Sequence, residues 1–411
     1  MKIILPFFIS LTVFFIPVVW SHGEAGSVSE KRIMNFPDTT NAKTIISDLH
    51  THSVFSDGHV WPNVRVTEAT RDGIDLLAIT EHLEYQPHLD HIPHTNRNAA
   101  YLEAKKAAKD EDLIVVSGSE ITREMPPGHI NAIFLQDSND LLFLDKKKIK
   151  MARLAIEESG EELSPQEFAM AEMYALANQW PAVLAVNEAN KQKAFVFWNH
   201  PGWTAQSPSG VAKLTDMHKT FIASSSLHGI EIVNGDTFSE EAFQIALDNK
   251  LTLIGTSDVH DLIDWDYPSE LGSHRPVTLI FSEKRNKRSI KKALFERRTV
   301  IWFKNILIGE SDNLVPLLES ILSTKSLGYS PGTKILKVEL LNNSSANLQL
   351  QNMSDFTFRT TSDLLEVPAN GRIEIQIKTL KKLNELQLDF KVMNAFIEPK
   401  IHPIIKISVK I

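Results

Sequence analysis

The stretch DLHTHSVFSDG, residues 48–58, decides the fold prediction because it joins an apolar run to side chains that bind metal ions. It places His50 and His52 on alternate positions and Asp57 a few residues later. Alternate side chains of a β-strand point to the same face, so both imidazoles can reach one ion. The stretch therefore predicts a strand that carries two metal ligands at its carboxyl end.

Similar side chains stand at the ends of later apolar runs. The runs DLLAITEH, LIVVSGSE, FVFWNHPG and TLIGTSDVH carry a histidine or an acidic residue at or near their ends, and HINAIFL begins with a histidine. Buried together without a cation, so many titratable groups would repel one another and lose their hydration. The pattern predicts a divalent metal centre. The polar residues at or near these ends are His50, His52, Glu81, His82, Glu120, His129, Asn199, His200, Asp258 and His260.

The order of apolar runs indicates the fold class. Eight candidate strands alternate with helical patterns between residues 44 and 305, which predicts a mostly parallel α/β sheet closed into a barrel or nearly so. Their sequences are TIISDLH, DLLAITEH, LIVVSGSE, HINAIFL, FVFWNHPG, GIEIVNG, TLIGTSDVH and TVIWF. In such a barrel the carboxyl ends of the strands share one face, so the scattered ligands would meet there.

Two further segments differ from this pattern. Residues 145–180, rich in Lys, Glu and Met, predict a helical insertion. Residues 310–411 alternate apolar and polar positions with period two, which predicts a small antiparallel β domain. That domain is expected to be a structural module or a surface-binding module, although it offers few aromatic residues for binding.

Composition limits the possible functions. The net charge of -8 with mixed signs argues against a nucleic-acid-binding protein, and the absence of cysteine excludes disulfides and thiolate metal sites. Residues 1–22 have one early lysine, Lys2, followed by an apolar run, which predicts a signal peptide and a periplasmic or secreted protein. The alternative is an uncleaved N-terminal membrane anchor.

The ordered motifs DLHTHSVFSDG, ITEH, SGSEIT, GHI, WNHPG and GTSDVH resemble those of the PHP family, named for polymerase and histidinol phosphatase domains. The resemblance spans residues 44–303. The expected signal peptide and C-terminal β domain make the chain most similar, within that family, to exported phosphodiesterases of the Sb-PDE type. The resemblance implies a distorted seven-stranded (β/α) TIM-like barrel with two or three divalent ions, either Mn, Zn or Fe.

The resemblance also implies a division of the ligands among the ions. His50, His52, Glu120 and Asp258 would hold the first ion. Glu120 would bridge to a second ion, which His129 and His200 complete, and Asp57, His82 and His260 would hold the third. Glu120 and Asp258 are accordingly the residues expected to be essential for catalysis. The family often has histidine where Asp57 stands. The aspartate of this chain is a hard oxygen ligand, and it favours Mn or Fe over Zn at that position. Glu81 replaces the commoner aspartate of that motif, which leaves its role open.

The expected reaction is hydrolysis of a small phosphate ester, with phosphodiesters favoured, by a hydroxide that bridges the ions. Candidate contacts for the substrate are Arg275, His274, His88 and Arg123, and Trp198 and Trp203 flank His200. The alternatives are a phosphomonoesterase of the histidinol-phosphatase kind and a PHP module that binds metal without catalysis. An amidohydrolase barrel is a further alternative, but it would ordinarily use a bridging lysine where Glu120 stands.

Overall fold

The structure is a computed structural model that describes most of the chain after the N-terminal segment. It describes residues 34–88, 91–92, 95–143, 146–159, 163–268 and 272–411. The signal peptide expected at residues 1–22 lies outside the described residues. Among the described helices, none has the length and apolar character needed to cross a lipid bilayer.

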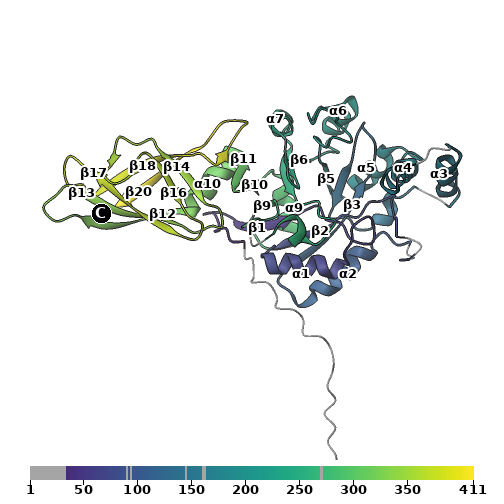
Figure 1. The fold of residues 1–411 in the computed structure, drawn as a ribbon, viewed down its shortest axis with the longest axis horizontal. Coiled ribbons are helices and arrows are strands. Elements are labelled where there is room, and N and C mark those ends of the chain that lie inside the picture. The colour runs from purple at the N-terminus through teal and green to yellow at the C-terminus, as the bar shows by residue number, and fades with distance from the viewer. Residues whose placement is uncertain (1–33, 89–90, 93–94, 144–145, 160–162, 269–271) are drawn as a thin grey trace, which may run out of the picture. The chain divides into compact units, whose positions relative to one another are not determined.

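A curled sheet of twelve strands forms the centre of the α/β part (Figure 1). The strands run in the order β19-β11-β10-β9-β1-β2-β3-β4-β5-β6-β7, and β8 pairs with β6 outside this path. Their bounds are β1 (Lys43–Asp48), β2 (Leu76–Ile79), β3 (Ile114–Ile121), β4 (Ile130–Ile133), β5 (Phe195–Trp198), β6 (Gly229–Asn234), β7 (Thr237–Phe238), β8 (Thr252–Thr256), β9 (Val277–Ser282), β10 (Thr299–Phe303), β11 (Ile306–Gly309) and β19 (Ala395–Phe396). A parallel bridge between Thr51 and Val259 brings the end of β1 beside the end of β8, so the sheet curls back on itself.

The sheet is mixed rather than mostly parallel. The pairs β1–β2, β2–β3, β5–β6 and β6–β8 are parallel, whereas β3–β4, β4–β5, β1–β9, β9–β10 and β10–β11 are antiparallel. The loop 122–129 between β3 and β4 contains no crossover helix, and a parallel neighbour would require one. The sequence pattern also missed β9, which ends on no ligand-type residue. The strand count of seven is therefore not confirmed.

Helices cover the sheet and are bounded by recognisable signals. Pro62 opens α1, and Gly73 ends it with a left-handed φ of 81°. Ser164 and Glu167 form a capping box at the start of α4. The helices are α1 (Pro62–Asp72), α2 (Ala99–Ala107), α3 (Lys146–Ser159), α4 (Pro165–Ala177), α5 (Ala182–Lys191), α6 (Asp216–Ala223), α7 (Glu240–Asn249), α8 (Ile263–Asp266), α9 (Lys287–Phe295) and α10 (Ser311–Ile321), with short 3-10 turns η1 (Ala108–Asp110) and η2 (Ser138–Leu141).

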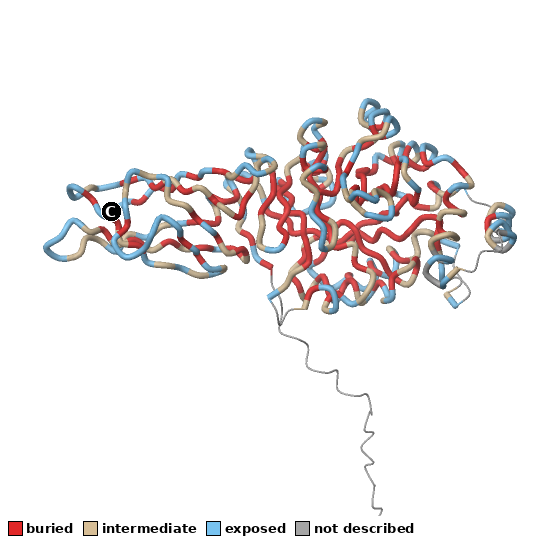
Figure 2. The backbone as a smooth tube through the Cα atoms, turned by 45° about the horizontal axis from the view of Figure 1, so that its top comes forward, coloured by how far each residue is buried: buried red, intermediate tan, exposed pale blue. Residues whose placement is uncertain are grey.

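The C-terminal domain is antiparallel and consists of two four-stranded sheets. Their orders are β12-β13-β17-β15 and β16-β14-β18-β20. The strands are β12 (Leu322–Tyr329), β13 (Ile335–Asn342), β14 (Leu348–Asn352), β15 (Thr357–Phe358), β16 (Leu364–Val367), β17 (Arg372–Lys378), β18 (Glu385–Val392) and β20 (Ile404–Lys410). Burial alternates along these strands, and Figure 2 shows the resulting mixture of buried and exposed segments in the C-terminal part. In contrast, β2 and β9 are buried throughout. One face of each C-terminal sheet therefore packs on the core and the other meets water.

The β10–β11 hairpin connects the two parts. Its turn residues Lys304 and Asn305 have φ values of 44° and 64°, as a two-residue type I′ turn requires. The Asn305 side chain accepts a hydrogen bond from the Asn347 backbone N–H, and the Asn394 amide donates to the carbonyls of both asparagines. Since β19 also pairs with β11, the C-terminal domain is tied directly to the central sheet.

Candidate metal centre

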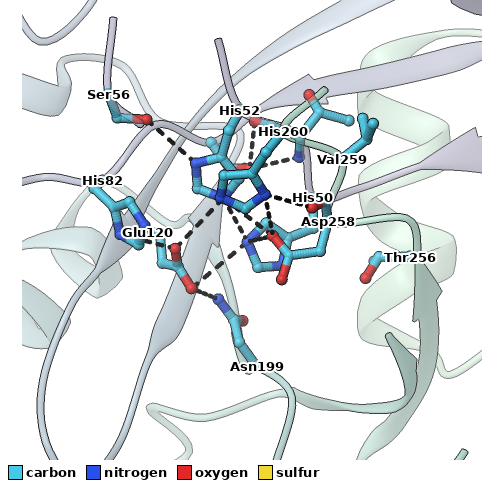
Figure 3. Close-up of polar contacts among 12 residues, drawn as sticks. His50, His52, Ser56, His82, Glu120, Asn199, Thr256, Asp258, Val259 and His260 are labelled. Carbon is cyan, nitrogen blue, oxygen red and sulfur yellow. Dashed lines mark hydrogen bonds and ion pairs between the residues drawn. The ribbon is translucent and has the colours of Figure 1, made fainter. Parts of the chain in front are cut away.

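All nine predicted ligands lie together where the strands of the curled sheet end. His50 and His52 follow β1, His82 follows β2, Glu120 lies near the end of β3, and His200 follows β5. His129 immediately precedes the antiparallel strand β4, so it reaches the same end, and Asp258 and His260 follow β8. These nine residues are called the metal rim below, and Figure 3 shows how its central members face one another.

The first part of the metal rim is a close triangle. The Nε2 atoms of His50 and His52 lie 3.0 Å apart, and Asp258 Oδ1 lies 3.1 Å and 3.2 Å from them. Glu120 approaches both imidazoles at 3.5 Å. One imidazole nitrogen from each histidine and one carboxylate oxygen thus converge on a small volume, as a bound cation requires.

A second group surrounds Asp57. Its carboxylate lies 3.1 Å from His82 Nε2, 3.3 Å from His260 Nε2 and 3.5 Å from His52 Nδ1. Ligand atoms of all four residues lie within 4.8 Å of one another. The aspartate in the SDG sequence therefore occupies a position from which it can bind an ion.

Glu120 is the centre of the third group. Its carboxylate oxygens lie 3.0 Å from His82 Nδ1, 3.1 Å from His129 Nδ1 and 3.3 Å from His200 Nε2. The Asn199 amide donates to the same carboxylate at 2.6 Å. Glu120 thus touches every group of the metal rim, which is the position a bridging carboxylate needs.

The groups overlap more than the expected division implies. His52 contributes to both of the first two groups, and His82 to both of the last two. His200 belongs to no complete group and joins through Glu120 alone. The division of ligands among three separate ions stays a prediction.

The charges within the metal rim suit cations. Burial alone would raise the pKa of Asp57 and Glu120, but the surrounding imidazoles hold the pKa of both carboxyls well below their usual range. Burial lowers the pKa of His52 and His129 to about 4, so these imidazoles are neutral and have a free lone pair. The Oδ1 atoms of Asp57 and Asp258 are buried and accept no hydrogen bond. A buried oxygen without a partner costs free energy, and a bound cation would remove that cost.

The backbone is strained at two rim residues. His200 and Asp258 adopt φ values of 27° and 53°, in the left-handed region that non-glycine residues rarely occupy. Such strain costs about 1–3 kcal/mol and persists where the surroundings demand one geometry, commonly at functional sites. Both residues turn sharply as their strands end, which directs their side chains into the metal rim.

Two buried residues that the sequence pattern missed support the metal rim from outside. Glu231 on β6 accepts from Thr256 Oγ1 at 2.7 Å and from the His200 backbone N–H at 2.6 Å, and it lies 2.9 Å from His50 Nδ1. A carboxylate inside the apolar run GIEIVNG is the signal that could have revealed it. Arg65 donates to the carbonyl oxygens of His52 and His260, and its position in an ordinary amphipathic helix gave no signal.

Glu81 has a supporting role rather than a ligand's role. Its carboxylate accepts from the Ser53 backbone N–H at 3.1 Å and from the hydroxyls of Ser53 and Ser56. Burial raises the pKa of Glu81 to about 7. Glu81 therefore fixes the loop that carries His52 and Asp57, one step behind the metal rim.

A cavity of about 580 Å³ lies over the metal rim and is called the first cavity. Part of its lining is apolar or aromatic, with Met170 and Met173 of α4, Tyr85 and Trp203. Trp203 stands at 5.2 Å from the His200 ring and 5.6 Å from the His129 ring, measured between centroids. The turn 234–237 between β6 and β7 forms the opposite wall. The opening of the metal centre is thus bordered by aromatic and thioether side chains.

The predicted substrate contacts through arginine are wrong. Arg275 is fully buried, where it donates to Asp48 and Asp72 at 3.1 Å and 2.8 Å, so its guanidinium is already paired. Arg123 is also buried, pairs with Glu84 and lies over the Trp180 ring at 4.1 Å. Neither guanidinium lines the first cavity.

The two histidines and two tryptophans have different outcomes. His274 stacks on Trp302 with centroids 3.4 Å apart, away from the first cavity, so its predicted contact is wrong. His88 is half-buried and is absent from the described lining of that cavity, and its role stays a prediction. Trp203 lines the cavity, whereas Trp198 is fully buried and stacks on His218.

The chain is similar to several known proteins. The crystal structure of a two-domain protein from Bacteroides vulgatus, described as containing a predicted PHP-like metal-dependent phosphoesterase, is 33% identical with a TM-score of 0.77. The match covers 93% of this chain and 100% of that one. The uncharacterized protein MJ1295 of Methanocaldococcus jannaschii is 27% identical over 228 residues, which are 55% of this chain and 87% of that protein. A family of Ig-like domains matches residues 322–408.

Proposed function

We infer the reaction from the family: the chain belongs to the PHP-like metal-dependent phosphoesterases, and we propose that it hydrolyses phosphodiesters at the metal rim. The observation that supports the choice of a diester is the lack of lysine and arginine in the first cavity. Neither residue type occurs in its described lining, and Asp236 adds a carboxylate to those of the metal rim. A monoester near neutral pH carries close to one more negative charge than a diester, and beyond the metal rim this cavity offers no lysine or arginine to pair with it.

The donor set fits two or three divalent ions. The residues that would hold them are His50, His52, Asp57, His82, Glu120, His129, His200, Asp258 and His260. Ions bound there would supply Lewis-acid activation of a water molecule and neutralise the charge of the phosphoryl group. Mixed imidazole and carboxylate ligands suit Mn, Fe or Zn.

The residues of the chain contribute position and exclusion of water. Glu120 and Asp258 are held by Asn199 and Asn234, whose amides donate to their carboxylates at 2.6 Å and 3.1 Å, so neither needs to reorganise when substrate arrives. Met173 and Trp203 line the first cavity, where their apolar surfaces would limit the access of bulk water to the metal rim. In the reaction, a water oxygen bonds to phosphorus, the bond from phosphorus to the leaving ester oxygen breaks, and that oxygen departs as an alcohol with a proton. The products are a phosphate monoester and an alcohol.

Metal analysis combined with two substrates tests the proposal. Purified protein should contain two or three divalent ions per chain and should hydrolyse bis(p-nitrophenyl) phosphate faster than p-nitrophenyl phosphate. Chelation should abolish turnover, and Mn, Fe or Zn should restore it. A preference for the monoester would support the histidinol-phosphatase alternative, and stoichiometric metal without turnover of either ester would support a non-catalytic module.

We also propose that the protein is exported, on the basis of the apolar run in residues 1–22. An external phosphodiesterase would release phosphate esters for uptake. N-terminal sequencing of protein from the periplasm or medium should show removal of that segment. An intact N-terminus in a membrane fraction would instead support the anchor.

A further inference from the structure

A second cavity of about 300 Å³ lies beside the first one. The two cavities share His200, Asn234 and Thr237, so a member of the metal rim stands at their boundary. The remaining walls of the second cavity come from the segment after β5 and from the β6–β7 hairpin, including Gly202 and Phe238. A phosphorus atom held near His200 would therefore have two separate spaces around it.

The walls of the second cavity differ chemically from those of the first. Gly202 and Gly210 contribute no side chain, and a Cβ atom added at Gly202 would lie 2.9 Å from the Gly210 carbonyl oxygen. Its polar lining residues are Glu231, Asn234, Thr237 and Ser239, and the aromatic residue in its described lining, apart from His200, is Phe238. The second cavity is thus smaller and more polar than the first, whose lining includes aromatic and thioether side chains.

We propose that the two cavities bind the two ester arms of one phosphodiester. The first cavity takes an aromatic or otherwise apolar arm, and the second takes a smaller arm that carries hydroxyl groups. This assignment rests on the proposed diesterase function and specifies its substrate class. The described lining of both cavities lacks lysine and arginine, so neither offers a partner of that kind to a charged arm, and we assign uncharged arms to both. Nucleoside diphosphates and other esters with a second anionic group are therefore expected to be poor substrates.

The test measures kcat/KM of the metal-loaded protein on two substrates with the same leaving group. These are p-nitrophenyl methyl phosphate, whose methyl arm is small, and bis(p-nitrophenyl) phosphate, whose second arm must enter the smaller cavity. Phe238 is 38% exposed, so its substitution leaves the core intact. Phe238→Trp should lower the ratio of kcat/KM for bis(p-nitrophenyl) phosphate to kcat/KM for p-nitrophenyl methyl phosphate by about 10-fold, because a few added atoms narrow the second cavity. Phe238→Ala should raise the same ratio because it widens that cavity.

Two controls separate the cavities from general effects. Met170→Trp narrows the first cavity, so it should reduce kcat/KM for both substrates and leave their ratio near that of wild type. Phe295, which is 42% exposed, lines neither cavity, and Phe295→Ala and Phe295→Trp should change nothing. Among esters with the same leaving group, a 2,3-dihydroxypropyl arm should bind with a lower KM than a propyl arm.

The outcomes distinguish this inference from the function beneath it. An unchanged ratio in both Phe238 variants, with metal-dependent turnover of both diesters, would overturn the assignment of arms and leave the diesterase standing. Equal KM values for the dihydroxypropyl and propyl esters would overturn the polar character of the second arm. Absence of metal-dependent turnover of every diester in the wild-type protein would remove the proposed function, and the inference with it.

Discussion

The metal rim and the C-terminal domain use burial in opposite ways. In the metal rim the buried side chains are titratable, they come from strands far apart in sequence, and two of them sit on strained backbone. In the C-terminal domain the buried side chains are almost all apolar, and they alternate with exposed residues along short strands. This difference indicates that the metal rim serves ligand binding and that the core of the C-terminal domain serves stability. Equivalent substitutions should therefore affect activity in one region and stability in the other.

The largest expected effect is at the carboxylate that touches all three ligand groups. Glu120→Gln keeps the size of the side chain but removes a negative charge that His82 and His129 face. Substituting a residue that only supports a metal ligand typically lowers activity by about 10–100-fold, and we expect a larger loss of turnover here. His50→Ala should act similarly. Steady-state kinetics, metal content and far-UV circular dichroism check the result, and the dichroism should remain close to that of wild type.

A graded series sharpens this prediction. Glu231→Gln, which alters only the support of His50 and His200, should cost about 10–100-fold in activity or metal affinity. Glu124→Gln, an exposed change four positions from Glu120, should have no effect. Normal turnover in the Glu120 variant would contradict the assignment of activity to the metal rim, because the metal rim would then not be the catalytic centre.

The second prediction concerns the core of the C-terminal domain. Phe390 on β18 is fully buried, so Phe390→Ala should lower the free energy of unfolding by about 3–5 kcal/mol through lost burial and the cavity left behind. Because this ring lies in the core that serves stability, kcat should be unchanged at temperatures where the variant is folded. Urea denaturation followed by fluorescence and a parallel assay measure both quantities.

The matched control is Leu380, which is 93% exposed. Leu380→Ala should change stability by less than about 0.5 kcal/mol. A fall in kcat for folded Phe390→Ala would show that the two regions are coupled, and the hydrogen bonds of Asn394 to Asn305 and Asn347 would be the first place to look.

The third prediction concerns a buried histidine outside the metal rim. Burial lowers the pKa of His218 to about 4, its Nε2 lies 2.6 Å from the Pro127 carbonyl oxygen, and Nδ1 accepts from the Thr215 backbone N–H. The unfolded chain binds the proton near pH 6.5, so this contribution to stability is full above pH 6.5 and is lost as the pH falls toward 4. The loss over that range should be about 3 kcal/mol.

His218→Gln should flatten this part of the pH profile. Urea denaturation of both proteins with a chelator present, between pH 7 and pH 4.5, isolates the difference because the metal rim titrates equally in each. Identical slopes in the two proteins would mean that the pKa of His218 is the same in the folded and unfolded states, which would contradict the prediction. The result bears on the comparison of the two regions because it measures the free-energy cost of protonating a buried histidine that lies outside the metal rim.

Much of the metal rim could be predicted from sequence because its chemistry is local. A histidine or carboxylate at the end of an apolar run is visible in the sequence alone, and the structure brings all nine such residues together. The supporting residues Glu231 and Arg65 were not predictable in the same way, because their roles depend on partners from other elements. The predicted contacts of Arg275 and Arg123 failed for the same reason, since position near a motif does not reveal which buried carboxylate a guanidinium meets.

The fold was predictable in type and less so in topology. Apolar runs identified most strands, and period-two alternation identified the C-terminal β domain. Strand direction depends on whether the connection includes a crossover helix, and the loop 122–129 was too ambiguous to show that β3 and β4 are antiparallel. The strand β9 was missed although its run VTLIFS resembles TVIWF, which was identified and likewise carries no ligand-type residue.

The smallest expected effect is a gain in stability at strained backbone outside the metal rim. Pro399 and Lys400 form a turn closed by a hydrogen bond from the Ile401 N–H to the Glu398 carbonyl, and Lys400 has a φ of 66°. Proline followed by a residue with positive φ is the pattern of a type II turn, which prefers glycine at the second position. Lys400→Gly should therefore stabilise the protein by about 0.5–1 kcal/mol, less the small contribution of its exposed ion pair with Glu240.

The same substitution at the metal rim should have the opposite consequence. Asp258→Gly also relieves a left-handed residue, yet it removes a ligand, so activity should be lost whatever happens to stability. Thermal unfolding and kinetics of the two glycine variants, measured side by side, give the comparison directly. If Lys400→Gly destabilised the protein, positive φ alone would not explain the cost at either site, and the strain at Asp258 could no longer be attributed to ligand placement.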